Sequence, residues 1–241
     1  MSSMSSDTAK SSELRTRPVF ITGGTGYMGQ RLITALTARG HQVRALVRRS
    51  SEQRSEQCPE HRLPPRCTPV VGNALDAATY SASVRPCDTF VHLVGVSHPS
   101  PAKAEQFRTI DQVSLEAAVA AATEARVSHF VYVSVAQPAP VMRVYQEVRA
   151  ACERTIRASG MNATILRPWY VLGPGHRWPY ALIPFYWIME QVPKFREGAR
   201  RLGLVTLQQM IQALQAAVEN PATGVQVLDV PAIRAAAEIY L

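Results

Sequence analysis

The sequence predicts a doubly wound α/β fold, in which helices cover both faces of a parallel sheet. Short apolar segments alternate with helical patterns from residue 18 onwards. The apolar segments are nearly continuous, which is typical of strands buried on both faces. A glycine-rich turn, ITGGTGYMG, joins the first of these segments to the first helical pattern. Together these observations indicate one α/β domain over residues 18–241.

The individual elements follow from the local patterns in order along the chain. Strands are expected at residues 18–22, 41–47, 67–72, 88–96, 129–135 and 162–167, and helices at residues 27–39, 104–125 and 143–159. Gly40 and Gly160 follow two of these helices, as glycines beyond a helix C-terminus commonly do. Residues 48–66 contain three prolines and many polar residues. This composition predicts a loop.

The alternation of strands and helices stops after Arg167. Residues 168–205 are rich in proline and aromatic residues, and we expect them to form a lid or pocket wall on the same domain. Thr206 and Gln209 fit a capping box that opens a helix ending near Glu219, and residues 224–230 predict a last strand. The serine-rich residues 1–17 predict a disordered tail.

Charge and composition narrow the classes of function. The 26 Lys and Arg residues outnumber the 18 Asp and Glu residues, for a net charge of +8. Such a charge favours phosphate, nucleic acid or an anionic membrane surface. No helix-turn-helix, zinc-finger or RNA-recognition pattern is present, so we expect no nucleic-acid partner. Four scattered cysteines lack metal-ligand spacing, so we expect no metal site.

Targeting signals are also missing from the sequence. The first 17 residues have no apolar region of the kind that a secretory signal contains. No apolar segment reaches the roughly 18–20 residues that a membrane span requires. A cytoplasmic location is therefore expected. The sequence favours no particular oligomeric state.

The glycine-rich turn carries the most specific chemical signal. Gly23, Gly26 and Gly29 recur every third residue between a strand and a helix. A dinucleotide needs a tight turn, bare backbone next to the pyrophosphate, and a helix N-terminus whose free N–H groups hold the anion. We therefore expect this turn to bind a dinucleotide. The residues expected to touch its phosphates are Gly23, Thr25, Gly26, Tyr27 and Met28.

The end of the second strand indicates which dinucleotide is preferred. An acidic residue roughly 20 positions beyond the glycines would bind the ribose 2′-hydroxyl of NAD(H). Arg48 and Arg49 stand there instead, and a guanidinium can pair with the 2′-phosphate of NADP(H). We therefore expect NADP(H) to be preferred, with NAD(H) possible. In the alternative interpretation both arginines are solvated loop charges.

With these motifs the chain resembles the short-chain dehydrogenase/reductase superfamily. The resemblance is to its extended and atypical branch, which includes NmrA-like and NAD-dependent epimerase/dehydratase-like proteins. It rests on TGGTGYMG, GNALD, VHLVG, VYVSV, YQEVR and LRPWYVLGPG, which together span most of residues 18–175. The resemblance implies a Rossmann fold that binds NAD(P) and acts on a small-molecule substrate.

The resemblance also assigns further cofactor contacts. It implies that Asn73 and Ala74 lie against the adenine, although the family usually has an aspartate where Asn73 stands. It places Leu93, Val94 and Gly95 beside the ribose. It nominates Pro168, Trp169 and Tyr170 as a pocket wall over the nicotinamide.

The catalytic set implied by the resemblance is a serine at the end of the fifth strand and a Tyr-x-x-x-Lys pattern on the next helix. Ser134 and Tyr145 match it, but Arg149 replaces the lysine. A phenol with a pKa of about 10 needs a nearby cation to exchange protons at neutral pH. A cation four residues further lies on the same helical face. Otherwise Tyr145 and Ser134 are structural, as a half-buried helix tyrosine and a serine bonded to nearby backbone.

Two functions of different class remain open. In the first, the protein is an NADP(H)-dependent oxidoreductase acting on a small carbonyl or quinone-like substrate. In the second, it is a non-catalytic dinucleotide-binding redox sensor or assembly subunit, which the replacement of lysine by Arg149 favours. The aromatic residues 177–190 would cover the substrate pocket, bind a protein partner or rest on a membrane surface.

Overall fold

The computed structural model describes residues 16–48, 63–64, 66–97, 99–139, 141–173 and 202–238. Most of the predicted tail, most of the loop at 48–66 and most of the predicted lid lie outside the described residues, as do Arg49 and residues 177–190. The remaining predictions can be compared with the structure directly.

A parallel sheet of seven strands forms the centre of the molecule, in the order β3-β2-β1-β4-β5-β6-β9. The strands are β1 (Pro18–Thr22), β2 (Gln42–Val47), β3 (Cys67–Val71), β4 (Thr89–His92), β5 (His129–Val133), β6 (Ala163–Leu166) and β9 (Val225–Leu228). In the register at the sheet centre, Val19 of β1 lies between Val43 of β2 and Thr89 of β4. The predicted α/β class with a parallel sheet is confirmed.

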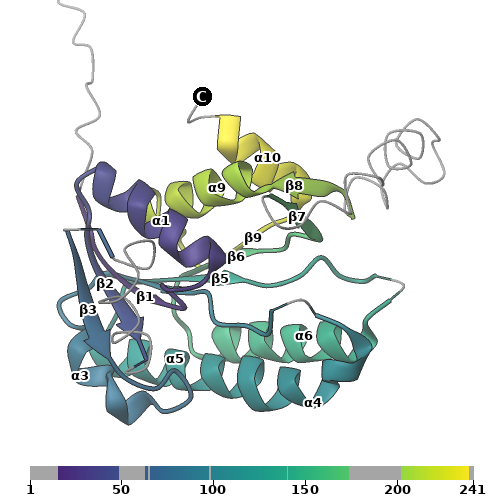
Figure 1. The fold of residues 1–241 in the computed structure, drawn as a ribbon, viewed down its shortest axis with the longest axis horizontal. Helices are drawn as coiled ribbons and strands as arrows, with labels where there is room; N and C mark the ends of the chain where they lie inside the picture. The colour runs from purple at the N-terminus through teal and green to yellow at the C-terminus, as the bar shows by residue number, and fades with distance from the viewer. Residues whose placement is uncertain are drawn as a thin grey trace, which may run out of the picture.

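Helices cover both faces of this sheet (Figure 1). On one face lie α1 (Tyr27–Ala38), α9 (Leu207–Glu219) and α10 (Val230–Glu238). On the other lie α3 (Ser81–Val84), α4 (Ala104–Gln106), α5 (Val113–Ala125) and α6 (Arg143–Ala158). Short helical turns complete this second layer, namely η2 (Ala77–Thr79), η3 (Pro101–Lys103) and η4 (Phe107–Gln112).

The two faces of β1 show why its apolar residues are continuous. Because successive strand side chains point to opposite faces, Val19 and Ile21 enter the core beneath α1 and α9, whereas Phe20 enters the core beneath α5 and α6. In the second core the rings of Phe20, Phe90 and Phe130 follow one another, with centroids 5.1 and 5.2 Å apart. Each such fully buried side chain stabilises the fold by about 1.5–3 kcal/mol.

The predicted ends of several helices are also confirmed. The hydroxyl of Thr206 accepts a hydrogen bond from the Gln209 amide at 3.1 Å, and the Gln209 side chain accepts one from the Thr206 amide at 2.9 Å. Gly40 and Gly160 have φ angles of +88° and +72° beyond their helices. Both are left-handed conformations that favour glycine.

Three parts of the fold differ from the sequence prediction. The expected helix 104–125 is interrupted by η4, which has π-helical geometry. The strands β7 (Tyr170–Leu172) and β8 (Leu204–Thr206) pair in a second, two-stranded sheet that was not predicted. The expected final strand ends at Leu228, and α10 begins at Val230. The Asp229 carboxylate caps this helix by accepting a hydrogen bond from the Ala232 amide at 3.0 Å.

Candidate functional site

The candidate site lies where the strand order reverses, between β1 and β4. Chain segments leaving these two strands diverge, which opens a crevice at the carboxyl end of the sheet. Two cavities of about 490 and 610 Å³ lie there. Both are lined by residues of the glycine turn and of the segment after β4, namely Gly23, Gly26, Leu93, Val94, Gly95, Val96 and Ser97.

The glycine turn is shaped so that side chains would block it. Gly23 has a φ of +76°, and a Cβ atom there would lie 2.7 Å from the Leu93 carbonyl carbon. A Cβ atom on Gly29 would collide with the Gly23 carbonyl oxygen. Helix α1 begins after Gly26, and no side chain caps its N-terminus. The first N–H groups of a helix have no acceptor within the helix. This arrangement fits a phosphate group held by backbone N–H donors.

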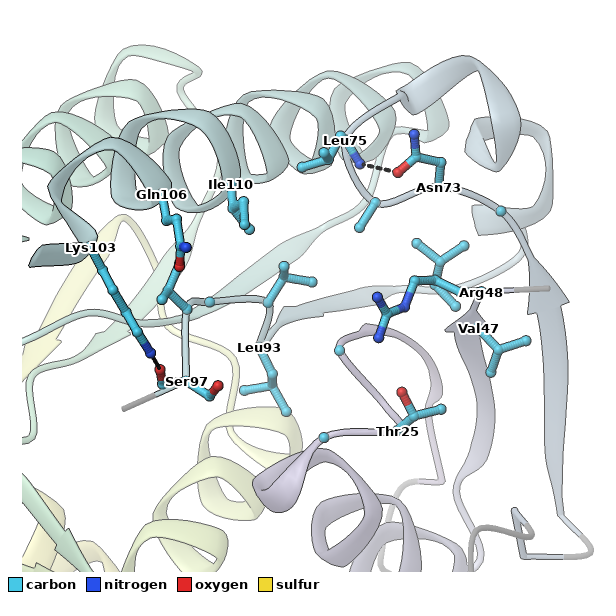
Figure 2. A pocket seen from close by; sticks show the side chains of 18 residues that line it. Thr25, Val47, Arg48, Asn73, Leu75, Leu93, Ser97, Lys103, Gln106 and Ile110 are labelled. Atoms are coloured by element: carbon cyan, nitrogen blue, oxygen red, sulfur yellow. Dashed lines mark hydrogen bonds between the residues drawn. The ribbon is translucent and has the colours of Figure 1, made fainter. Parts of the chain in front are cut away.

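Arg48 also lines the 490 Å³ cavity. Figure 2 shows its guanidinium directed into the cavity, on the same side as Thr25 and at the end of β2. The side chain is exposed and forms no ion pair with a carboxylate among the described residues. Arg48 therefore lines the cleft, and its bond to a 2′-phosphate stays a prediction.

Asn73 and Ala74 line the same cavity, as the resemblance implied. The Asn73 side-chain oxygen accepts a hydrogen bond from the Leu75 amide at 3.1 Å (Figure 2). The backbone N–H of Asn73 donates to the Thr79 hydroxyl at 2.9 Å. An uncharged amide therefore completes this turn in place of the family's usual carboxylate.

Sequence reasoning missed one wall of this cavity. Leu75, Lys103, Gln106 and Ile110 also line it. The Lys103 ammonium donates to the Ser97 carbonyl at 2.6 Å and so joins η3 to the segment after β4 (Figure 2). Three of these residues belong to η3, α4 and η4, and only the three-dimensional fold brings them to the glycine turn.

Ser134, Tyr145 and Arg149, which were predicted from separate motifs, converge on the 610 Å³ cavity. Tyr27 and Met28 of the first helix line it as well. The Tyr145 ring packs against Phe107, with centroids 4.9 Å apart. Among the residues that the structure describes, the Tyr145 hydroxyl has no hydrogen-bond partner. It is therefore available to a bound molecule.

Arg149 is held by neutral and charged partners beneath this cavity. One guanidinium nitrogen donates to the Tyr132 hydroxyl at 2.9 Å and to the Val133 carbonyl at 3.1 Å. The other lies 3.0 Å from an Asp111 carboxylate oxygen. The guanidinium carbon lies 5.1 Å from the centre of the Tyr145 ring. A cation therefore lies next to the tyrosine, at the position where the resemblance implies one.

The pKa values of Arg149 and Asp111 follow from burial and from the charges around them. Burial alone would lower the pKa of Arg149, but Tyr132, Tyr145 and Asp111 offset this, and its pKa lies well above the ordinary value. Burial raises the pKa of Asp111, whereas Arg149 and the Val96 amide lower it. The Val96 amide donates to Asp111 at 2.7 Å. Arg149 thus remains a cation throughout the physiological range and cannot itself release a proton.

Glu153 lies on α6 and links Ser134 to the end of β6. It accepts a hydrogen bond from Arg167 Nε at 2.9 Å. It also accepts one from the Ser134 hydroxyl at 2.6 Å.

Other nominated residues lie elsewhere. Pro168, Trp169 and Tyr170 are not among the described residues that line the two cavities. The Pro168 carbonyl accepts a hydrogen bond from the Ala136 amide at 2.9 Å, and the Trp169 and Tyr170 rings pack edge-on, 5.3 Å apart. Their closure over a nicotinamide stays a prediction.

None of the helices in the described part of the chain is both long and apolar enough to cross a membrane. No group of three His, Cys, Asp or Glu side chains there is arranged to hold a metal ion. Cys67, Cys87 and Cys152 are buried free thiols.

Comparison with known proteins agrees with this geometry. A family model described as NAD(P)H-binding matches residues 23–177. A ketoreductase of Stigmatella aurantiaca, acting on 4-hydroxy-2-methyl-3-oxo-4-farnesyl-3,4-dihydroquinoline-1-oxide, is 28% identical over 64% of the chain and 50% of its own length. A ceramide reductase of Caulobacter vibrioides is 29% identical over 65% of the chain and 47% of its own length. The chain spans about half the length of these curated relatives.

Solved structures share the fold at low sequence identity. WbmH of Bordetella bronchiseptica, solved with NAD+, superposes with a TM-score of 0.65 and 22% identity over 89% of this chain and 76% of that one. DesIV of Streptomyces venezuelae, a dTDP-glucose 4,6-dehydratase solved with NAD, gives 0.64 and 20% over 88% and 75%. The predicted likeness to the epimerase/dehydratase-like branch is confirmed at the level of the fold.

Proposed function

Because the chain belongs to the NAD(P)H-binding family, we propose that it is an NADP(H)-dependent oxidoreductase that acts on a small carbonyl or quinone-like substrate. The observation that carries the proposal is the convergence of Ser134, Tyr145 and Arg149 on a cavity that the glycine turn also lines. Relatives named as a ketoreductase and a reductase support the same class of reaction.

The residues present fit a dinucleotide at two points. The glycine turn leaves no room for side chains where a pyrophosphate would approach. Arg149 keeps one buried donor, its Nε–H, without a partner in the described structure, although the residue is only 6% exposed. A buried N–H of this kind is costly unless something accepts from it. A ribose hydroxyl of the cofactor beside Tyr145 is a suitable acceptor.

The protein's own groups would handle the proton in this reaction. When bound, the dinucleotide supplies the hydride that reduces the substrate carbon. Tyr145 donates its phenolic proton to the carbonyl oxygen, because its hydroxyl is the open donor in the cavity. Arg149 stabilises the phenolate that remains, since its permanent positive charge lies 5.1 Å from the ring centre. Solvent protons then restore the phenol.

NADP(H) is the preferred cofactor in this proposal. Arg48 enters the adenosine end of the cleft, and Asn73 brings no negative charge there. A guanidinium forms paired hydrogen bonds with a phosphate. A nearby carboxylate would repel the phosphate, because both groups are anions. The ribose 2′-phosphate is the group that distinguishes NADP(H) from NAD(H).

A second candidate is a dinucleotide-binding redox sensor or assembly subunit without turnover. It is favoured by one observation, which is that Arg149 is fixed by Asp111, Tyr132 and Val133 and does not release protons. In this alternative the same cleft binds the cofactor, and the buried pair serves stability alone.

One experiment separates the two candidates. Purified protein is mixed with NADPH and a panel of ketones and quinones, and the loss of reduced-nicotinamide absorbance is followed. The oxidoreductase oxidises NADPH with at least one substrate, and Tyr145→Phe abolishes most of that activity while NADPH still binds. Tight NADPH binding without turnover on the whole panel would favour the sensor or subunit.

A further inference from the structure

The direction of one hydrogen bond constrains what this cavity can recognise. Ser134 Oγ lies 2.6 Å from Glu153 Oε1, and the two residues are 4% and 3% exposed. Glu153 also receives hydrogen bonds from Gln137 Nε2 at 2.8 Å and from Arg167 Nε at 2.9 Å. A carboxylate engaged by a guanidinium is an acceptor only. Ser134 must therefore be the donor in its bond to Glu153.

This bond uses the only proton that a serine hydroxyl has. Ser134 lines the 610 Å³ cavity, and among the described residues nothing else bonds to its Oγ. What Ser134 presents to the cavity is thus a pair of acceptor lone pairs. Tyr145 lines the same cavity and presents an open O–H donor. The site therefore pairs one donor with one acceptor.

A simple ketone satisfies only half of this pairing. Its carbonyl oxygen accepts from Tyr145, but it has no proton to offer Ser134, and two acceptors facing each other are unfavourable. Resting on the oxidoreductase proposed above, we propose that the substrate carries a hydrogen-bond donor on the atom next to the carbonyl carbon, as an α-hydroxy or α-acylamino ketone does. The carbonyl binds Tyr145, and the neighbouring O–H or N–H donates to Ser134.

The reaction on such a substrate is balanced without a further reagent. The hydride of NADPH forms the new C–H bond at the carbonyl carbon, and the carbon–oxygen π bond breaks. The Tyr145 proton goes to the oxygen, which yields a vicinal diol or an N-acylamino alcohol, together with NADP+. Ser134 keeps its proton on the Glu153 side throughout. Glu153 is therefore a positioning residue that sets the polarity of Ser134 without touching the substrate.

Three matched probes test this assignment. α-Hydroxyacetophenone has the adjacent donor, α-methoxyacetophenone has the same oxygen without its proton, and acetophenone has neither. With NADPH and the wild-type protein, kcat/KM for the hydroxy ketone is expected to exceed that for the methoxy ketone by about tenfold, which is the range of one satisfied buried hydrogen bond. The preference is expected to appear mainly in KM.

Two variants place the preference on the proposed residues. Ser134→Ala leaves Glu153 with Arg167 and Gln137, and it is expected to bring the hydroxy and methoxy ketones to within about twofold of each other. Glu153→Ala removes the acceptor of the Ser134 proton, so this proton becomes free to turn towards the cavity, and the variant is expected to reduce the preference in the same way. The matched control is Glu147→Ala at an exposed position of α6, which is expected to retain the preference.

The outcomes distinguish this inference from the function it rests on. Equal use of the hydroxy and methoxy ketones by the wild-type protein, or a preference that survives Ser134→Ala, would overturn the inference and leave the oxidoreductase standing. A Glu153→Ala variant that slows all three probes alike would assign Glu153 a structural role only. Absence of NADPH oxidation with these probes and with the wider panel of ketones and quinones would overturn both proposals.

Discussion

Arg149 and Asp111 form a buried ion pair, in which a guanidinium nitrogen lies 3.0 Å from a carboxylate oxygen and the side chains are 7% and 0% exposed. The pair joins α6 to the π-helical turn η4. The other Asp111 oxygen accepts from the Val96 amide in the segment after β4, at 2.7 Å. The cation beside Tyr145 is therefore anchored to the same segment that lines the dinucleotide cleft.

Breaking this pair from one side is expected to destabilise the protein strongly. Arg149→Leu leaves the Asp111 carboxylate buried without its counter-charge, which costs about 3–5 kcal/mol of unfolding free energy. Adding Asp111→Asn removes the unpaired charge, so the double variant is expected to be more stable than Arg149→Leu alone. Urea denaturation measures both. A double variant no more stable than the single one would contradict a true buried ion pair.

Removing the proposed acid is expected to stop turnover without loss of binding. Tyr145→Phe keeps the ring that packs on Phe107 and removes only the hydroxyl. General acid catalysis contributes about 10²–10⁴-fold, so kcat is expected to fall by that factor while the Kd for NADPH stays the same. Stopped-flow kinetics and calorimetry give the two values. Unchanged kcat would remove Tyr145 from the mechanism.

The charge of Arg48 is expected to decide between the two dinucleotides. Arg48→Ala removes the guanidinium from the adenosine end of the cleft, and the Kd for NADPH is expected to rise by about tenfold or more, with little change for NADH. Arg154→Ala is the control, because Arg154 is exposed on α6 and its replacement removes the same net charge. Equal weakening of NADPH and NADH binding by Arg48→Ala would argue against a 2′-phosphate contact.

A buried histidine beneath the site is expected to make stability depend on pH. Burial, reinforced by Arg149, lowers the pKa of His92 from 6.5 to about 3. In the unfolded chain His92 gains a proton as pH falls through 6.5, whereas in the folded protein it stays neutral and bonded to Thr22 at 2.8 Å. The unfolded state thus binds more protons between about pH 6.5 and pH 3, and stability is lost as the pH falls through this window.

The measurement that isolates this effect is the slope of unfolding free energy against pH. His92 contributes up to about 1.4 kcal/mol per pH unit in that window, and His92→Asn is expected to reduce the slope by this amount. The absolute stability of the variant does not enter the comparison. An unchanged slope would show that His92 titrates alike in the folded and unfolded chain.

The fold could be predicted from local patterns wherever a single segment determined the outcome. The continuous apolar strands, the glycine turn and the capping box at Thr206 each depend on neighbouring residues, and each is confirmed. The strands β7 and β8 were missed because each is three residues long and its partner lies far along the chain. The π-helical turn was missed because Phe107–Gln112 has an ordinary helical composition.

The candidate site was predictable in its residue types but not in its hydrogen-bond partners. Ser134, Tyr145 and Arg149 stand at recognisable spacings, and the structure brings them to one cavity. The partners of Arg149 and Ser134 are Asp111 and Glu153, which lie 38 and 19 residues away in the sequence. Tertiary packing alone decides that Glu153 binds Arg167 and not the arginines on its own helix.

The account depends most directly on dinucleotide binding at the glycine turn, and calorimetric titration of the wild-type protein with NADPH and with NADH tests it. Both dinucleotides are expected to bind with one site per chain, and NADPH is expected to bind about tenfold or more tightly, because only its 2′-phosphate can pair with Arg48. Binding of neither would contradict the assignment of the cleft between β1 and β4.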